Sequence, residues 1–423
     1  MDMNSNIHLD DRAVLCALFD AALAAALPEG KFDGRLPDPP KGRTIVLGGG
    51  KAAARMAAAF ETAWEAAGHP PPQGLVVTRY GHGCPTRFIE VVEAAHPVPD
   101  AAGLEASARL LALARAAGPD DLVVFLISGG ASALMALPAP GVTLADKQAI
   151  NRALLSSGAP IAAMNRVRKA LSAIKGGRLA AAAAPARMIT YLISDVPGDD
   201  PAAIGSGPTV AEASDPRGAL AVLADYGIAV EPRIAEAILA NHVEAGPDGT
   251  MVMLATPKMA LDAAAEAARG LGLAPLVLGD AIEGEAREVA RVLAAIATYA
   301  ADHGEPVAPP AVILSGGETT VTVRGKGRGG RNAEFLLALA LALRGHAAIA
   351  AIAADTDGID GSEDNAGAWF SSVILAEAKA AGLDPASFLA NNDGYGFFQA
   401  LDRLIVTGPT RTNVNDFRAV LIR

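Results

Sequence analysis

Short apolar runs of strand length alternate with longer stretches of helical periodicity along most of this chain. The predicted strands are residues 43–47, 74–78, 88–92, 121–127, 188–193, 250–255, 274–278, 311–314, 319–323, 347–353 and 418–422. The predicted helices are residues 12–27, 52–67, 101–117, 144–155, 161–184, 216–226, 233–239, 257–271, 283–301 and 332–343. This alternation is typical of α/β proteins with largely parallel sheets.

A polar stretch rich in Gly and Pro, Asn241 to Gly249, interrupts the alternation, which then restarts. The 423 residues suffice for two or three ordinary domains. We therefore predict two α/β domains, residues 1–240 and 241–423.

Composition narrows the class of protein. No apolar run reaches the ~18 residues of a transmembrane helix without Gly, Pro or charge, and Met1 to Asp11 lacks the cationic start of a signal peptide. The only cysteines, Cys16 and Cys84, make no disulfide framework, which fits a reducing cytoplasm. The net charge of −11 argues against non-specific nucleic-acid binding, although a local basic cluster would suffice for a nucleotide.

Turns rich in glycine or acidic residues follow several predicted strands. They are 48–51, 128–132, 194–200, 315–318 and 355–364. In open parallel sheets, ligands bind outside the carboxyl ends of the strands. Since the turns come from both halves of the chain, we expect one active site in a cleft between the two domains.

The first turn, Gly48-Gly49-Gly50-Lys51, opens a helix, so it can bind an anion with Lys51 as the cation. Its spacing also meets the weak dinucleotide fingerprint G-x-G-x-x-A. That fingerprint expects an acid after the second strand, where the chain has Thr78-Arg79-Tyr80, so NAD is disfavoured and Arg79 would suit a 2′-phosphate. A plain tight turn with a solvated lysine is the remaining alternative.

The second turn, Ser128-Gly129-Gly130-Ala131-Ser132, can cradle a phosphate or carboxylate with its amides. A serine hydrolase is disfavoured because the pattern G-x-S-x-G is not met. The late histidines, His303 and His346, also lie outside any glycine-rich or acidic turn. A simple tight turn stays open.

The third glycine turn, Ser315-Gly316-Gly317-Glu318, precedes a loop with Lys326, Arg328 and Arg331, and a helix predicted to begin at Asn332. Amide-rich turns beside cations at a helix start predict a polyphosphate site. Arg331, at the helix start, is the cation we favour.

One face of the predicted helix 161–184 carries Asn165, Arg168, Lys169, Ser172 and Lys175. Such a face can bind an acidic substrate, or it can simply be solvated. Carboxylates that follow strands, Asp195 and Asp357, suit Mg²⁺, although a single Asp is often only a turn residue.

Several segments occur in an order that is specific at family level. They are G-G-G-K-A-A (48–53), S-G-G-A-S-A-L (128–134), N-R-V-R-K-A-L-S-A-I-K-G-G-R-L-A (165–180), S-D-V-P-G-D-D-P-A-A-I-G-S-G-P-T (194–209), I-E-G-E-A-R-E (282–288), S-G-G-E-T-T-V (315–321), G-R-G-G-R-N-A-E (327–334), D-T-D-G-I-D-G (355–361) and T-G-P-T-R-T-N-V-N-D (407–416). Together they resemble the glycerate 2-kinases of the MOFRL type, a family also named hydroxypyruvate reductases.

The resemblance implies a Rossmann-like N-terminal domain, a C-terminal MOFRL domain, and transfer of the γ-phosphoryl group of ATP to the 2-hydroxyl of D-glycerate with Mg²⁺. The product would be 2-phosphoglycerate. Lys51 matches the family's lysine in G-G-K, and Arg331 matches the arginine in G-G-R-N. Ala170 stands where family members often have histidine, so no role is carried over there.

We therefore expect Lys51, Arg331, Asp195 and Asp357 to be catalytic, the two aspartates as metal ligands or orienting groups. The residues expected to bind substrate or ATP are Gly49, Gly50, Ser128, Gly129, Gly130, Ser132, Asn165, Arg168, Lys175, Ser315, Gly316, Gly317, Glu318 and Asn332. The expected partners are D-glycerate and ATP, without nucleic acid or membrane, and a homodimer is the assembly considered. The alternatives are an NAD(P)H-dependent hydroxypyruvate reductase and a non-catalytic binding protein.

Overall fold

A computed structural model describes residues 10–243 and 249–423. They form two compact units, which we name after one residue of each. The Lys51 unit comprises Pro28–Leu254 and Arg411–Asn413, and the Arg331 unit comprises the described residues up to Leu27 with Ala255–Thr410 and Val414–Arg423. The predicted absence of a signal peptide concerns residues 1–11, of which 1–9 lie outside the described residues, as do 244–248 of the predicted boundary.

The Lys51 unit is built on a sheet of six described strands in the order β3-β2-β1-β4-β5-β6. The strands are β1 Thr44–Gly49, β2 Gln73–Arg79, β3 Ile89–Ala94, β4 Leu122–Ser128, β5 Arg187–Ile193 and β6 Thr250–Ala255. The pairings β1–β2, β2–β3, β1–β4 and β4–β5 are parallel, as predicted. This is the strand order of doubly wound dinucleotide-binding sheets, in which ligands bind where the order reverses, here between β1 and β4.

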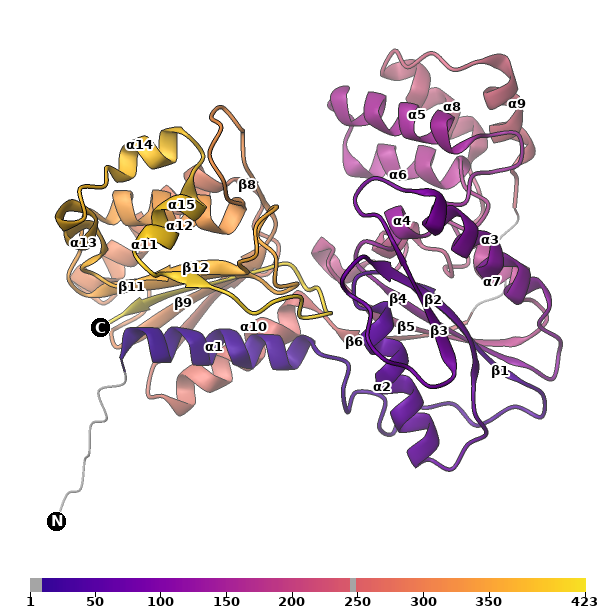
Figure 1. Ribbon diagram of the computed structural model, residues 1–423, viewed down its shortest axis with the longest axis horizontal. Helices are drawn as coiled ribbons and strands as arrows, with labels where there is room; N and C mark the ends of the chain where they lie inside the picture. Colours follow the sequence, from indigo (N-terminus) through magenta and orange to yellow (C-terminus); the bar gives the residue numbers. More distant parts are fainter. Residues whose placement is uncertain (1–9, 244–248) are drawn as a thin grey trace. The chain divides into compact units, whose positions relative to one another are not determined.

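Helices cover both faces of this sheet (Figure 1). Helix α2 (Ala53–Ala66) packs on one face, and α3 (Ala101–Arg115), α4 (Ala131–Leu134) and α7 (Arg178–Ala183) share a core with the other. Because β1 and β4 are buried on both faces, they read as continuous apolar runs, which made them visible in the sequence.

Four further helices of the Lys51 unit form a group with its own apolar core (Figure 1). They are α5 Leu144–Ser156, α6 Ile161–Ala170, α8 Pro216–Asp225 and α9 Pro232–Ala240. The single helix predicted for 161–184 is wrong, because α6 ends at Ala170 and α7 begins at Arg178. Gly176 and Gly177 between them have φ of 58° and 77°, which a continuous right-handed helix excludes.

The sheet of the Arg331 unit runs β13-β12-β11-β14-β9-β7. Its strands are β7 Ala274–Gly279, β9 Ala311–Gly317, β11 Ile349–Asp355, β12 Gly367–Phe370, β13 Leu404–Ile405 and β14 Asp416–Ile422. Among the described strands of this sheet, only β7–β9 is a parallel pair, and the other four pairings are antiparallel. The prediction of a largely parallel sheet is therefore wrong for this unit, although its α/β class is confirmed.

The antiparallel pairs follow from the connections. A loop without a helix joins β11 to β12, and parallel neighbours need a crossover, usually a helix. The last strand, β14, inserts between β11 and β9 and runs against both. Its register places Asp416 opposite Gly317 on one side and Asp355 on the other, at the edge where β9 and β11 end.

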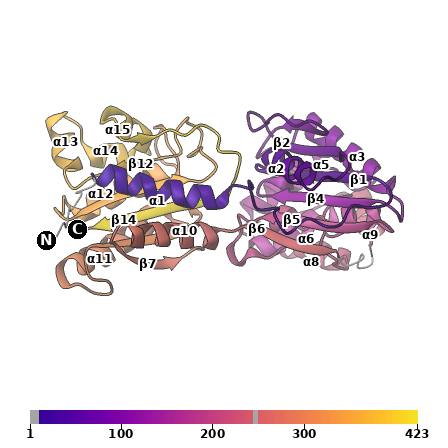
Figure 2. The ribbon, with the colours of Figure 1, turned by 90° about the horizontal axis from the view of Figure 1, so that it is seen from below.

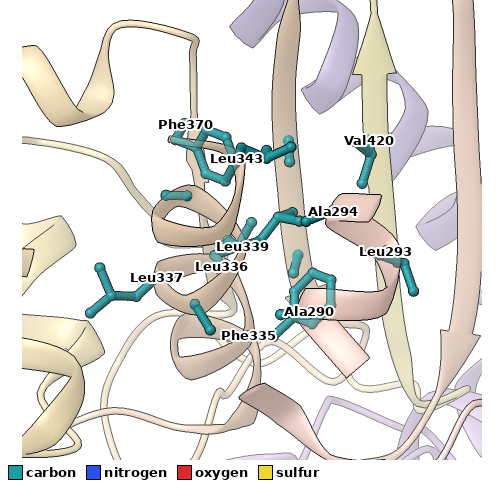
Figure 3. Packing of buried hydrophobic residues seen from close by; sticks show 14 of the residues in the cluster. Ala290, Leu293, Ala294, Phe335, Leu336, Leu337, Leu339, Leu343, Phe370 and Val420 are labelled. Atoms are coloured by element: carbon teal, nitrogen blue, oxygen red, sulfur yellow. The ribbon is translucent and has the colours of Figure 1, made fainter. Parts of the chain in front are cut away.

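Helices also cover both faces of this second sheet. On one face, α1 (Asp11–Ala26) packs beside α10 (Pro257–Gly270), as Figures 1 and 2 show. On the other, α11 (Ala286–His303) and α12 (Arg331–Leu343) pack together, with Leu293, Leu336 and Leu339 in the core of Figure 3. Helix α1 thus belongs with the second sheet and β6 with the first, so the compact units divide the chain differently from the predicted boundary at 240/241.

The remaining elements are short. They are η1 Pro197–Asp199, η2 Ile204–Ser206, β8 Gly284–Glu285, β10 Thr319–Thr320, α13 Ile374–Ala380, α14 Pro385–Ala390 and α15 Gly394–Ala400. The strand predicted for 319–323 is reduced to β10, which pairs with β8 over two residues. Within the described ranges, no helix is both long and apolar enough to span a membrane.

Candidate functional site

The turn between β1 and α2 uses its backbone donors within the protein. The N–H of Lys51 donates to the Gly129 carbonyl oxygen at 2.8 Å, that of Ala52 to Ser128 Oγ at 3.0 Å, and that of Ala53 to the Gly50 carbonyl oxygen at 3.1 Å. A helix start binds an anion through such donors when they lack partners. This turn therefore presents the half-buried Lys51 side chain rather than an amide cradle.

Other atoms of the protein occupy the space where a side chain would stand on the glycines of this turn. A Cβ on Gly50, whose φ is +135°, would lie 2.1 Å from Ser128 Oγ, and one on Gly49 would lie 2.7 Å from Met135 Cγ. In the dinucleotide fingerprint the corresponding glycine lets the backbone approach the pyrophosphate. Packing accounts for Gly49 and Gly50 here, and their contact with a ligand stays a prediction.

The neighbouring turn after β4 brings several polar side chains together. A Cβ on Gly129 would lie 1.9 Å from Asp195 Oδ2, and one on Gly130 would lie 3.2 Å from both Lys51 Cγ and His96 Nε2. The ends of β1, β4 and β5 therefore converge, as the topological rule predicts. The sequence analysis identified Lys51 and Asp195 as site residues but not His96.

Asn413 joins the same place from the carboxyl-terminal part of the chain. Its Nδ2 donates to Asp195 Oδ2 at 3.0 Å. The segment 407–416 contributes to the family resemblance, but no role was predicted for Asn413 within it. Nothing in the local pattern marks it, because its partner lies 218 positions away.

Beside Gly130 opens a pocket of about 420 Å³, within the Lys51 unit. Lys147, Arg168 and Lys175 line it from α5, α6 and the chain before α7, together with Ser132 and His96. No carboxylate is among its lining residues in the described part of the chain. Four predicted residues, Gly130, Ser132, Arg168 and Lys175, line the pocket, whereas Lys147 was missed because it stands alone in an ordinary helical pattern.

The predicted polar helix face is only partly realised. Asn165 Oδ1 accepts from Arg168 at 3.3 Å, so it orients the pocket's guanidinium. Lys169 instead forms an ion pair with Glu212 at 2.5 Å. Ser172 lies beyond the end of α6 and forms an isolated β-bridge with Pro138, so it does not belong to the polar face of the helix.

The two pocket lysines are buried without a carboxylate among the lining residues. Lys175 Nζ donates to the carbonyl oxygen of Ser132 and, at 2.8 Å, to its Oγ. Lys147 Nζ donates to the Ala136 carbonyl oxygen at 3.3 Å. Burial, followed by repulsion from neighbouring cations, lowers the pKa of Lys147 to about 8 and holds the pKa of Lys175 well below its usual range.

In the Arg331 unit, the favoured arginine is surrounded by carboxylates. Its Nε donates to Asp416 Oδ1, Nη1 to Glu318 Oε1 and Nη2 to Asp355 Oδ2, each at 2.8 Å. Burial alone would lower the pKa of Arg331, but the charges of Asp416, Asp355 and Glu318 raise it overall. We call these four residues the Arg331 cluster.

A second, fully buried arginine, Arg418, also contacts the cluster through Asp416. Arg418 is fully buried and donates to Asp416 Oδ2 at 2.7 Å. It also donates to Thr319 Oγ1 at 3.1 Å and to the Gly316 carbonyl oxygen at 3.4 Å. Asp416 is thereby fixed between two guanidinium groups.

The start of α12 is capped from within the unit. Both oxygens of Asp360 accept backbone N–H bonds, from Asn332 and Ala333, each at 2.9 Å. Asn332 Nδ2 also donates to Asp416 Oδ1 at 2.8 Å. This helix start, predicted as part of a polyphosphate site, is therefore occupied by a carboxylate of the protein.

The other predicted residues of this unit have local partners. A Cβ on Gly317 would lie 2.3 Å from the Ile282 backbone nitrogen, and the Gly316 carbonyl oxygen accepts from that nitrogen at 3.1 Å. Among the described residues, the buried Ser315 hydroxyl has no hydrogen-bond partner. Arg328 stacks on Tyr395, its guanidinium carbon 4.7 Å from the ring centre.

The candidate metal ligands Asp195 and Asp357 lie in different units. Asp357 is buried, and its Oδ1 accepts from the Ile359 N–H at 2.8 Å, the bond of a turn residue. Among the described residues, no group of three or more His, Cys, Asp or Glu side chains is placed to hold a metal ion.

Two family descriptions match the sequence. Residues 14–239 match a domain of unknown function, DUF4147, and residues 311–416 match the MOFRL family. The first match covers more than half of the 423 residues.

Similar proteins extend over nearly the whole chain. An Agrobacterium vitis protein named provisionally as a hydroxypyruvate reductase is 54% identical over 97% of this chain and 94% of its own length. A D-glycerate 2-kinase of Thermotoga maritima is 38% identical over 95% of this chain and 96% of its own. A crystal structure of a glycerate kinase from Thermotoga maritima aligns with a TM-score of 0.88 at 36% identity, over 97% of this chain and 99% of that one.

Proposed function

We infer, because this chain belongs to the MOFRL-type family of glycerate 2-kinases, that it phosphorylates D-glycerate at the 2-hydroxyl with ATP, giving 2-phosphoglycerate. Membership makes it a kinase, and the acceptor and donor are part of the proposal. Its two described units are α/β, as expected from the sequence.

The observation that carries the proposal is the pocket beside Lys51. Phosphoryl transfer needs little covalent chemistry from the protein and depends on positioning and charge neutralisation. Lys147 and Lys175 are buried and Arg168 is partly buried, and with no lining carboxylate in the described residues they provide a place for a multiply charged anion. Lys51 flanks Gly130 at the same end of the sheet.

We assign Lys51 to the transferred phosphoryl group. Its ammonium would neutralise charge that grows on the phosphoryl oxygens in the transition state. Arg331 is proposed to act on a phosphoryl or carboxylate oxygen as well, as the match to the family's arginine implies. Since its three nitrogens already donate to carboxylates, its position is fixed before any ligand arrives.

Asp195 or Asp357 would hold Mg²⁺ or orient the attacking hydroxyl. Magnesium typically takes one or two carboxylates and completes its shell with water and substrate phosphates, and it neutralises their charge. Because no group of three or more candidate ligand side chains occurs among the described residues, we propose that the ion binds with substrate phosphates rather than in a resident all-protein site. The hydrogen bond from Asn413 fixes the Asp195 carboxylate in place.

The hydroxypyruvate reductase remains the second candidate because a relative with 54% identity bears that provisional name. Its cofactor would be NAD(P)H. Two observations disfavour it: Ser128 fills the space that Gly50 leaves, and β2 ends in Arg79 rather than in an acid for the ribose.

One pair of assays tests the proposal. The purified chain is incubated with D-glycerate, ATP and Mg²⁺ while ADP release is followed, and separately with hydroxypyruvate and NAD(P)H while nicotinamide absorbance is followed. We expect turnover only in the first assay, with 2-phosphoglycerate as the product by NMR. Turnover only in the second would establish the reductase instead.

A further inference from the structure

The pocket of the Lys51 unit combines two kinds of lining. Its floor is formed by basic side chains. Lys175 and Lys147 are buried there, 2% and 8% exposed, and Arg168 lies beside them. Its rim is apolar, since Val98 and Leu155 are 61% and 59% exposed while also lining it. A ligand that fits must therefore be anionic at one end and apolar at the other.

The rim is held in place by the protein. Gln148 Nε2 on α5 donates to the Pro99 carbonyl oxygen at 3.0 Å, which ties the loop of Val98 to the helix that carries Leu155. Two large apolar side chains exposed at one pocket would lose contact with water if a flat apolar group of a ligand covered them, and this burial would favour binding.

The floor lacks its counter-charge. A buried ammonium costs several kcal/mol unless it is paired, and the charged groups that act on Lys175 are Lys147 and Arg168, which repel it. An anion with several negative oxygens would relieve this repulsion. A single carboxylate would leave most of it in place.

Size also separates the candidate ligands. At about 30 Å³ for each water-sized group, a three-carbon hydroxy acid with roughly seven non-hydrogen atoms would fill only about half of the 420 Å³, whereas a nucleoside diphosphate with roughly 27 would exceed it and extend out of the pocket. Pockets of about 300–1,000 Å³ usually hold larger organic ligands. A three-carbon acid also has no apolar part to meet Val98 and Leu155.

We propose that this pocket is the nucleotide site of the kinase, with the phosphate chain on Lys147, Arg168 and Lys175 and the base on the rim of Val98 and Leu155. The inference rests on the proposed function and assigns the acceptor acid to other residues. Gly130 and Ser132, which also line the pocket, place its end beside Lys51. The terminal phosphate would emerge there.

Equilibrium binding of ADP to the full chain, without any acid acceptor, tests the site by calorimetry. Leu155→Asp is the main variant, because the side chain is exposed and the change should not unfold α5. We expect about tenfold weaker ADP binding, from lost apolar contact and repulsion of phosphate. Lys147→Met should weaken ADP binding roughly 10- to 100-fold by removing a charged hydrogen-bond donor.

Leu239→Asp is the matched control, because Leu239 is 46% exposed on α9 of the same unit and does not line the pocket. It should bind ADP like the wild type. Steady-state kinetics complete the test: in Leu155→Asp the KM for ATP should rise and the KM for D-glycerate should stay unchanged. A raised KM for D-glycerate with unchanged ADP affinity would overturn the proposal and make the pocket the acceptor site.

The calorimetry also separates this proposal from the proposed function. If the wild type binds ADP, and Leu155→Asp binds it weakly, the nucleotide site stands even when D-glycerate is not phosphorylated. If the wild type does not bind ADP, or both variants bind it as the wild type does, the nucleotide site is wrong whatever the acceptor.

Discussion

Arg331 and Arg168 are both partly buried guanidinium groups, yet the charged groups around them have opposite signs. Arg331 donates to three carboxylates, whereas Arg168 shares a pocket with Lys147 and Lys175 and donates to the neutral oxygens of Asn151 and Asn165. Burial lowers the pKa of Arg168, while the pKa of Arg331 is raised overall by its carboxylates. One cation is paired with carboxylates, whereas the other has no carboxylate among the described residues that line its pocket.

This difference bears on how each residue can act. A compensated cation such as Arg331 is rigid and contributes to stability, because its removal takes an ion-pair partner from the buried carboxylates of Asp355 and Asp416. An uncompensated cation such as Lys147 costs stability in the free protein and returns it when an anion binds. Arg331 and Lys147 should therefore respond in opposite ways to neutral substitution.

The largest effect is expected for Arg331→Met. Asp355 and Asp416 would each lose a buried ion-pair partner, and only Asp416 keeps a second arginine, Arg418, so the free energy of unfolding should fall by about 3–5 kcal/mol. Urea unfolding measures it, with Arg269→Met, an exposed arginine on α10, as the control. A loss as small as that of the control would show that the cluster is not a structural unit.

The next effect is on catalysis, for Lys51→Ala. Removal of one preorganised charge at the phosphoryl group should lower kcat/KM by about 10²–10³-fold, since the side chain is only half-buried and its loss should leave the fold intact. Coupled ADP-release kinetics measure it, and Lys258→Ala, a surface lysine 68% exposed, is the control. Near wild-type kinetics would remove Lys51 from the site.

Lys147→Met should instead stabilise the free protein. Burial and then Arg168 lower the pKa of Lys147 from 10.5 to about 8, so below pH ~8 the folded state carries a charged, buried amine. His96, Arg152, Arg168 and Lys175 also line the pocket, and they add no negative charge. We expect a gain of roughly 1–3 kcal/mol near pH ~7.

The sign of its pH dependence follows from linkage. The unfolded chain binds more protons at this lysine between pH ~8 and ~10.5, so the wild type gains stability over that range and the advantage of Lys147→Met shrinks. Urea unfolding near pH ~7 and pH ~10 measures both values. A loss of stability independent of pH would mean that Lys147 is compensated after all.

The smallest effect is expected for Glu318→Gln. This carboxylate is the exposed member of the Arg331 cluster, with 53% of its side chain exposed, so its ion pair is well screened. The free energy of unfolding should change by less than about 1 kcal/mol. If the loss in kcat/KM, expressed as a free energy, exceeds the loss in the free energy of unfolding, the predicted contact of Glu318 with substrate is supported.

Local chemistry made much of the candidate site visible in the sequence. Glycine turns after apolar runs predicted the ends of β1, β4 and β9, and the structure brings Lys51, Gly130 and Asp195 together at the first two and at β5. The predicted start of α12 near Asn332 is also confirmed. These features depend on residues that are neighbours in the chain, which is why pattern and spacing sufficed.

Other features depend on residues that meet only in the folded chain. The space beside Gly50 is taken by Ser128, and the carboxylates that fix Arg331 include Asp416, which is 85 positions away. Lys147 enters the pocket from a helix with no unusual pattern. No local signal distinguishes a turn that cradles a ligand from one filled by the protein.

The sequence by itself determined most of the longer strands and helices and the turns that follow them, because backbone propensity and apolar periodicity are local. Tertiary structure decided which cations are compensated. It also decided that β14 runs against its neighbours and that α1 packs with the second sheet. Charge compensation and strand pairing are sums over residues far apart in the chain, so they exist only once it has folded.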